Sequence, residues 1–338
     1  MIKKYPAIIC LMVIILFTQT GLYAQTKKDS LFAGVERIDP AFDAMITNKF
    51  SFEVAGEGFD WCEGPVWVAD KEMLLFSDIP KNTVYKWTPK KGIEVYLKPS
   101  GYTSTKPRGG EMGSNGLLLN KKGQLILAQD GDRRVALMNA PIQAPKPNFI
   151  TLANNYKGKR FDSPNDMALR SNGDIYFTDP PYGLEFYIDD TAKDAPYQGV
   201  YKLAVDGTVT LLTDTINRPN GIGILPGDTT ILISNSESEK AIWYAYDLDK
   251  NGLFTNPHIF YDASAIAMEK GGGPDGFKVD SKGNVYSSGP EGIWIFDKTG
   301  KVLGKIKING RVSNCALAYN ETVLFVTADD YLLKIRLR

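Results

Sequence analysis

The chain has 338 residues and contains little cysteine and almost no histidine. Its three cysteines, Cys10, Cys62 and Cys315, are too few for a disulfide scaffold, so a hydrophobic core must hold the fold. Its one histidine, His258, lies in a segment that reads as an outer strand or loop. A Ser-His-Asp triad is therefore nearly excluded.

The sequence also has no excess of positive or negative charge. The 39 basic residues balance 39 acidic ones, and no run of five Lys or Arg occurs, which argues against a nucleic-acid partner. The apolar stretch Ala7–Phe17 follows Lys3 and Lys4 and is too short to span a bilayer. We therefore expect residues 1–24 to be a cleaved signal peptide, and the protein to be periplasmic or secreted, with no membrane span.

One pattern recurs six times along the rest of the chain: a polar residue, an apolar strand, a turn and a second apolar strand. The copies begin 39 to 55 residues apart, at Glu63, Asn115, Asn165, Asn220, Asp275 and Asn314. The second strands are expected at residues 73–77, 124–128, 174–178, 230–234, 284–288 and 323–327. Repeats of this length and type are typical of the blades of a β-propeller.

The last copy ends after three strands, whereas an unpaired strand, Lys49–Val54, precedes the first copy. Pairing these two segments would close a ring and remove an exposed sheet edge. We predict an all-β fold, a six-bladed β-propeller formed as a single domain by residues 49–338, after a lead-in segment at 25–48. Helical periodicity is expected only at residues 40–47. Two β-sandwich domains are the alternative, but they leave six copies at one period unexplained.

Equivalent residues of a closed propeller form a ring around its axis, so the six starting residues should face one another across a channel. Two carboxylates and four carboxamides are costly to bury without partners. An oxygen-only set with two negative charges suits one divalent ion, Ca²⁺ first, with Mg²⁺, Mn²⁺ or Zn²⁺ as substitutes. The alternative is that each Asx-Gly pair is ordinary turn chemistry.

Five ordered motifs resemble the gluconolactonase and senescence-marker-protein (regucalcin) family, and the similarity runs from about Phe52 to the C-terminus. The motifs are residues 63–67, 163–166, 177–183, 218–221 and 273–276. The resemblance implies a six-bladed propeller with one metal ion that hydrolyses sugar lactones. It implies Glu63, Asn220 and Asp275 as the principal ligands. It also implies Asn165 as a weaker ligand that touches substrate, and Asp275 as the carboxylate that transfers a proton.

Substrate contacts are less well marked in the sequence. Asn115 lies on the ring but outside the motif-matched ligands, so we expect it to contact substrate. Arg160, Tyr182 and Glu185 are placed near the mouth of the third blade, where they could bond to a polyol or be exposed loop residues. Gln129-Asp130-Gly131 stands where many bacterial members of the family have Glu-His-Gly, so the sequence leaves the substrate open.

The leading hypothesis is a lactonase, a carboxylic-ester hydrolase acting on a small lactone. A metal ion can polarise the carbonyl and lower the pKa of water, and Asp275 can move the proton. Phosphotriester hydrolysis at the same site and a non-catalytic binding propeller are the alternatives, and no partner protein is evident. Cys62 and Cys315 flank ring positions of neighbouring blades, so an oxidising compartment could join them.

Overall fold

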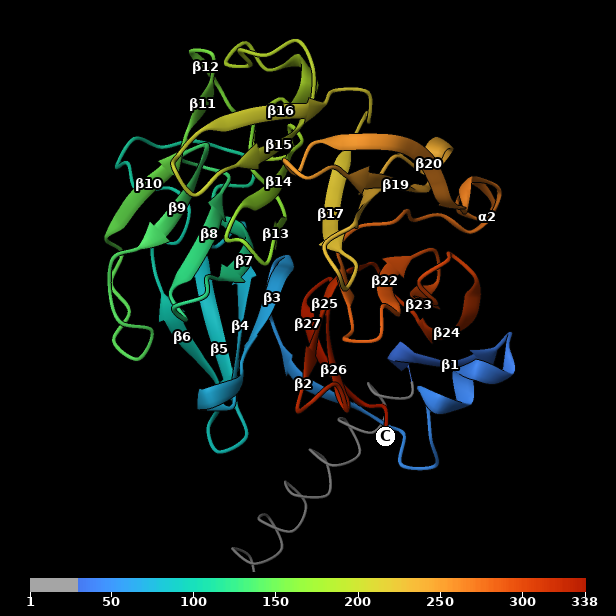
Figure 1. The fold of residues 1–338 in the computed structure, drawn as a ribbon. Coiled ribbons are helices and arrows are strands. Elements are labelled where there is room, and N and C mark those ends of the chain that lie inside the picture. The colour runs from blue at the N-terminus through green and yellow to red at the C-terminus, as the bar shows by residue number, and fades with distance from the viewer. Residues whose placement is uncertain (1–29) are drawn as a thin grey trace, which may run out of the picture.

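The computed structural model describes residues 30–338, so the predicted signal peptide at 1–24 lies outside the described residues. Six antiparallel sheets surround a central axis, and the chain passes from one to the next in order (Figure 1). The strands of blades 1 to 3, from the axis outward, are β3 (Cys62–Val68), β4 (Met73–Asp78), β5 (Thr83–Thr88) and β6 (Gly92–Leu97); β7 (Ser114–Leu119), β8 (Leu125–Gln129), β9 (Arg134–Met138) and β10 (Phe149–Ala153); and β13 (Met167–Leu169), β14 (Ile175–Asp179), β15 (Gly199–Leu203) and β16 (Val209–Thr213).

Blades 4 and 5 repeat the same meander, and blade 6 contains strands from both ends of the described chain. Their strands are β17 (Pro219–Ile224), β18 (Thr230–Asn235), β19 (Ile242–Leu248) and β20 (Phe254–Asp262); β21 (Phe277–Val279), β22 (Val285–Gly289), β23 (Gly292–Phe296) and β24 (Val302–Ile308); and β25 (Val312–Ala318), β26 (Val323–Ala328), β27 (Tyr331–Arg336) and β2 (Ser51–Glu57). The all-β, six-bladed prediction is confirmed, and each predicted second strand is found within one residue of its expected start.

The ring closes where the sequence predicted. Strand β2 pairs antiparallel with β27, with Phe52 opposite Ile335 and Val54 opposite Leu333. Phe52 and Ile335 are buried there. The pairing covers an edge of the last sheet that would otherwise expose unpaired N–H and C=O groups.

The lead-in segment contains a strand that the sequence did not reveal. Strand β1 (Phe32–Arg37) pairs with β24 and makes blade 5 five-stranded. The expected helical stretch is a short 3₁₀ helix, η1 (Pro40–Ala44), which buries Phe42. The Asp39 side chain caps this helix by accepting from the Ala41 N–H. The lead-in therefore covers the outer edge of a blade.

The remaining elements lie in loops between strands. A helix that we did not expect, α2 (Ser264–Lys270), precedes β21, and only its Ala267 is buried. Such a short helix has no apolar stripe for a sequence pattern to reveal. The others are η2 (Ala69–Lys71), η3 (Tyr187–Asp189), η4 (Ser238–Lys240) and the hairpin of β11 (Asn155–Tyr156) with β12 (Lys159–Arg160). Within residues 30–338, no helix is long and apolar enough to cross a membrane.

Neighbouring blades are held together by buried aromatic and aliphatic side chains. Between blades 6 and 1, the centroid of the Phe325 ring lies 4.9 Å from that of Trp87 and 5.9 Å from that of Trp67. Between blades 4 and 5, the ring centroids of Trp294 and the fully buried Trp243 lie 6.0 Å apart. Large rings between neighbouring sheets bury much apolar surface, which fixes the blades around the axis.

The proposed disulfide between Cys62 and Cys315 does not occur in the structure. Both residues are free, buried thiols. The Cys315 thiol donates to the carbonyl of Tyr286 at 3.1 Å, and burial raises the pKa of Cys315 to about 12. Burial also raises the pKa of Cys62. Both side chains act as small core residues, because a buried thiol with a raised pKa remains protonated and unreactive.

Candidate active site

A central cavity of about 800 Å³ opens where the inner strands begin. Five of the six predicted ring residues line it: Glu63, Asn115, Asn165, Asn220 and Asp275. Glu63 and the three asparagines among them are almost fully buried, and Asp275 is half-buried. Glu63 and Asp275, the two carboxylates of the predicted ring, thus face the same cavity.

Local irregularities in the inner strands present these side chains to the axis. In blades 1, 2 and 4, the pairing of the first two strands slips by one residue at Glu63, Asn115 and Asn220. Such a β-bulge redirects the side chain next to it. In blades 3 and 5, Asn165 and Asp275 lie just before the inner strand starts. Irregular backbone therefore carries all five cavity-lining ring residues.

Hydroxyl groups on the second strands anchor this irregular backbone from the preceding blade. Three such bonds join a second strand to the carbonyl of a ring residue on the next blade. They are Ser77 Oγ to Asn115 O (2.9 Å), Thr178 Oγ1 to Asn220 O (2.7 Å) and Ser234 Oγ to Asp275 O (2.6 Å). Because the ring backbone lacks regular strand pairing, these side chains satisfy its buried carbonyl groups. The ring is thereby tied to blade-to-blade contacts.

Several oxygens around the cavity are buried without a hydrogen-bond donor. They are Oδ1 of Asn115, Oδ1 of Asn165 and Oδ1 of Asp275. A buried acceptor without a partner is costly, and native proteins rarely leave one unless an ion or water fills the gap. Glu63 differs, because its Oε2 accepts from the Gly64 N–H (2.7 Å) and from Asn314 Nδ2 (3.1 Å).

The carboxyl groups at the cavity crowd one another away from water. Burial raises the pKa of Glu63 to about 8, with the Asp166 carboxylate adding to the rise and the Gly64 N–H opposing it. Burial, followed by the carboxylates of Glu63 and Glu111, raises the pKa of Asp275 well above its ordinary value. Burial also raises the pKa of Glu111 to about 7. Negative charge on these buried carboxyl groups is therefore costly, and a cation held beside them would offset that cost.

These observations fit a hard divalent cation held by carboxylate and carboxamide oxygens. Within the described residues, no three His, Cys, Asp or Glu side chains gather into a metal-binding group. An ion here would therefore depend on amide oxygens as well as on Glu63 and Asp275. This composition favours Ca²⁺ or Mg²⁺ over softer ions that prefer imidazole or thiolate. The assignment of Glu63, Asn165, Asn220 and Asp275 as ligands stays a prediction.

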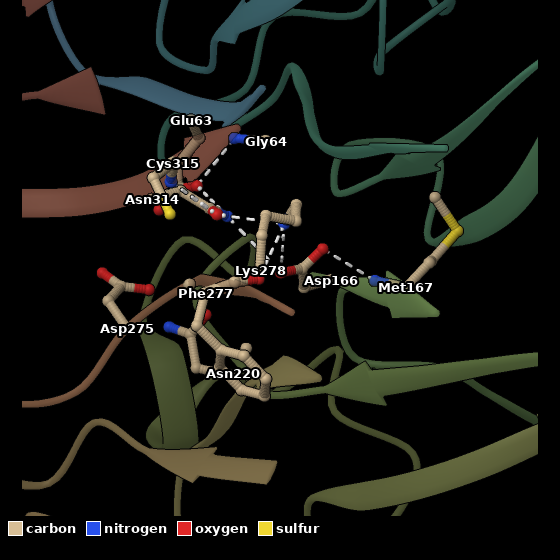
Figure 2. Close-up of polar contacts among 12 residues, drawn as sticks. Glu63, Gly64, Asp166, Met167, Asn220, Asp275, Phe277, Lys278, Asn314 and Cys315 are labelled. Carbon is tan, nitrogen blue, oxygen red and sulfur yellow. Dashed lines mark hydrogen bonds and ion pairs between the residues drawn. The ribbon is translucent and has the colours of Figure 1, made fainter. Parts of the chain in front are cut away.

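The sixth ring residue, Asn314, does not line the cavity and instead lies among other side chains (Figure 2). Its Oδ1 accepts from the Cys315 N–H (2.9 Å) and from Lys278 Nζ (3.1 Å). Its Nδ2 donates to Glu63 and to Asp166. The carboxamide is fully used within the protein, so the ring presents five side chains and not six.

Two of the predicted substrate contacts are not brought to the cavity. Arg160, on β12, and Glu185, before η3, are both exposed and absent from its walls. Asn115, Asn165 and Tyr182 do line the cavity. His258 is exposed on the outer strand β20, as its sequence context suggested.

Sequence reasoning missed Glu111, a carboxyl on the cavity wall. It stands four residues before Asn115 in the glycine-rich segment 109–113, and that spacing was the one signal available. Trp61, Ser236 and Arg311 also line the cavity and were not singled out. They lie in loops at the mouth, where strand periodicity gives no information.

Comparisons with known proteins agree with this architecture. The model of the SMP-30/Gluconolactonase/LRE-like region matches residues 61–329. A gluconolactonase from Zymomonas mobilis is 36% identical over 94% of this chain and 91% of its own length. A pentonolactonase from Haloferax volcanii is 25% identical over 73% of each chain.

A solved gluconolactonase structure from Xanthomonas campestris has the same fold. It superposes with a TM-score of 0.75 at 24% identity, and the match covers 90% of this chain and 94% of that chain. The family match and the Zymomonas relative both extend over most of the sequence. The chain belongs to the SMP-30/gluconolactonase/LRE-like family.

Proposed function

We propose that this protein is a metal-dependent lactonase that opens aldonolactones. Its relatives are named gluconolactonase and pentonolactonase, and this supports the assignment of the chain as a lactone hydrolase. The observation that carries the proposal is the convergence of Glu63, Asn165, Asn220 and Asp275 on one cavity that contains unpartnered buried oxygens. These side chains would hold the ion.

The reaction is hydrolysis of an ester within a ring. The oxygen of water bonds to the carbonyl carbon, the bond from that carbon to the ring oxygen breaks, and a proton passes from the water to the departing oxygen. When bound, the ion supplies Lewis-acid polarisation of a carbonyl and a water of lowered pKa. The remaining work belongs to the side chains of the cavity.

Asp275 is the residue that we propose moves the proton. Its backbone is fixed on both sides, since its N–H donates to Ser288 Oγ (2.8 Å) and its carbonyl accepts from Ser234 Oγ (2.6 Å). Its Oδ1 is buried without a donor, so a lone pair remains for a proton. A carboxylate so positioned can take a proton from water and return it to the ring oxygen.

The cavity walls suit a hydroxylated substrate. Asn115, Tyr182 and Ser236 carry neutral donors and acceptors, and Glu111 adds a carboxyl group. Polar groups at fixed positions orient a sugar through its hydroxyl groups and penalise analogues that lack them. We therefore propose five- and six-carbon aldonolactones as the substrate class.

The test is a substrate panel assayed with and without a chelator. Acid release from five- and six-carbon aldonolactones should exceed the uncatalysed rate, and a phosphotriester should react far more slowly. Exhaustive chelation should reduce lactone hydrolysis to background, because Glu63 and Asp275 alone leave the carbonyl unpolarised. Adding back Ca²⁺, Mg²⁺, Mn²⁺ or Zn²⁺ separately should identify the ion that restores the activity.

The outcomes separate the hypotheses. Full activity after chelation, with no ion detected by elemental analysis, would contradict the metal requirement. Faster turnover of the phosphotriester would favour the organophosphate alternative. An absence of turnover on every substrate, together with ion binding, would favour a binding propeller.

We propose that the protein is exported after removal of residues 1–24. The support is sequence alone: Lys3 and Lys4 precede the apolar stretch Ala7–Phe17, and the small Ala24 precedes the expected cut. Expression of the full chain in a bacterial host should give a periplasmic or secreted protein that begins near Gln25. N-terminal sequencing and cell fractionation provide the measurement. A cytoplasmic protein that retains residues 1–24 would contradict the proposal.

A further inference from the structure

A polar network lies beside the candidate ion site and links four blades. It consists of Glu63 of blade 1, Asp166 of blade 3, Lys278 of blade 5 and Asn314 of blade 6 (Figure 2). Asp166 and Lys278 occupy positions where the other blades have different residue types. Asp166 directly follows ring residue Asn165, where four of the other five copies have glycine. Lys278 lies three residues after Asp275, where the other copies have only apolar residues or glycine.

Lys278 is fully engaged within this network. Its Nζ donates to Asn314 Oδ1 (3.1 Å) and to the carbonyl of Phe277 (3.0 Å), and it lies 3.7 Å from Asp166 Oδ2. An ammonium group has three donors and no acceptor, so these three partners account for it. Asp166 is almost fully buried, and a buried carboxylate needs such a counter-charge.

The network allows one orientation of the Asn314 carboxamide. The ammonium of Lys278 can only donate, so it must face Asn314 Oδ1. The carboxylates of Glu63 and Asp166 only accept, so they must face Nδ2, at 3.1 and 3.4 Å. The backbone of Gly276 leaves the space for this side chain, because a Cβ at that position would collide with the Asn314 carboxamide.

The fixed amide in turn orients Glu63. Its Oε2 is committed to Asn314 Nδ2 and to the Gly64 N–H, which leaves Oε1 as the oxygen free to face an ion. We propose that Lys278 is a positioning residue for the ion site. It holds Asn314, and Asn314 holds the Glu63 carboxylate with one oxygen available. This inference rests on the proposed ion site, and it adds a residue that does not line the cavity.

The proposal predicts whether removal of Lys278 weakens or tightens ion binding. If Lys278 had no positioning role, its positive charge would only repel a divalent ion, and its removal would tighten ion binding. Loss of a group that orients a ligand instead weakens binding, by about 10- to 100-fold for residues behind metal ligands. Lys278→Met should therefore raise the Kd for Ca²⁺ at least about tenfold.

The experiment is calorimetric titration of Ca²⁺ into chelator-stripped wild-type protein and variants, with the thermal unfolding of each stripped protein recorded in parallel. Lys202→Met is the matched control, since the Lys202 ammonium also bonds a backbone carbonyl, that of Asn251, away from the cavity. It should leave the Kd within about threefold of wild type, because in residues 30–338 no hydrogen bond connects Lys202 to a proposed ligand.

A double variant separates positioning from simple charge balance. If Lys278 only neutralises Asp166, then Lys278→Met with Asp166→Asn should return the Kd to the wild-type value. If Lys278 positions Asn314, the double variant should remain weak. Should Lys278→Met fail to fold, Lys278→Gln tests the same role, because it removes the charge while it keeps a donor for Asn314 Oδ1. A Kd close to the wild-type value would support positioning by the donated hydrogen bond, and a Kd raised about tenfold would contradict it.

The results distinguish failure of this inference from failure of the proposed function. Wild-type protein that binds no Ca²⁺, Mg²⁺, Mn²⁺ or Zn²⁺ would overturn both. Wild-type binding with an unchanged or lower Kd in Lys278→Met would overturn the positioning role alone. A raised Kd in Lys278→Met that persists in the double variant, with the Lys202→Met control unchanged, would establish it.

Discussion

Replacement of Asp275 with asparagine is expected to lower kcat for lactone hydrolysis by about 10²- to 10⁴-fold, even with the metal ion at saturation. Asparagine preserves the shape of the side chain and one oxygen donor, but it removes a negative charge and nearly all basicity. Because the backbone of Asp275 is held by Ser234 and Ser288, the substituted side chain should occupy the same place. Ion binding should persist, although more weakly.

The measurement is kcat across a metal titration. Asp297→Asn is the matched control, because Asp297 belongs to the same blade but caps the turn after β23, where it accepts from the Thr299 N–H. Its kcat should stay within about twofold of wild type, as is usual for a substitution remote from the reacting groups. Full rescue of Asp275→Asn by excess ion would reduce Asp275 to a ligand and remove its role in proton transfer.

Replacement of Gly64 with alanine is expected to destabilise the fold by about 3 to 5 kcal/mol, combining a left-handed backbone with overpacking. Gly64 has φ of 51°, which favours glycine. An added Cβ would collide with the carbonyl oxygen of Asn115 and lie 2.7 Å from Cα of Gly116. Those atoms are backbone of the next blade, so relief requires blades 1 and 2 to separate.

Gly123→Ala is the matched control for Gly64→Ala. Gly123 also has positive φ, 71°, but an added Cβ there would meet nothing within 4 Å. It should lose only about 1 to 2 kcal/mol, the cost of the backbone conformation alone. Urea unfolding followed by circular dichroism measures both variants. Equal losses in the two would show that close packing between the inner strands does not limit stability.

The repeating strands could be predicted from the sequence because each blade is local. A blade is a meander of consecutive strands, so the pattern of apolar runs and turns along the chain reports its sheet directly. The closing pair of β2 with β27 was also predictable, since an unpaired strand at one end matched an incomplete blade at the other. By contrast, β1 mixes glycine and charged residues in Phe32–Arg37, and it forms a strand because the edge of β24 is there to pair with it.

The candidate site divides in the same way. The ring positions follow from the repeat, and five of the six side chains reach the cavity. Arg160 and Glu185 are exposed and do not line it, because the direction of their loops is encoded in no periodicity. Glu111 lies on the wall because the irregular segment before β7 turns it inward. Loop direction is a tertiary property, set by packing between blades.

The number of blades, the strand order, the closure and the residues at the start of each inner strand could be inferred without coordinates, because each follows from the repeating pattern of strands along the chain. Which oxygens remain free depends on contacts between blades. Asn314 matches the repeat as well as Asn165 does, yet Lys278, Asp166 and Glu63 use both ends of its amide. Asn165 Oδ1 has no such partners. The difference arises because hydrogen bonds across the axis join residues from separate blades. These residues come within hydrogen-bonding distance only once the ring has closed.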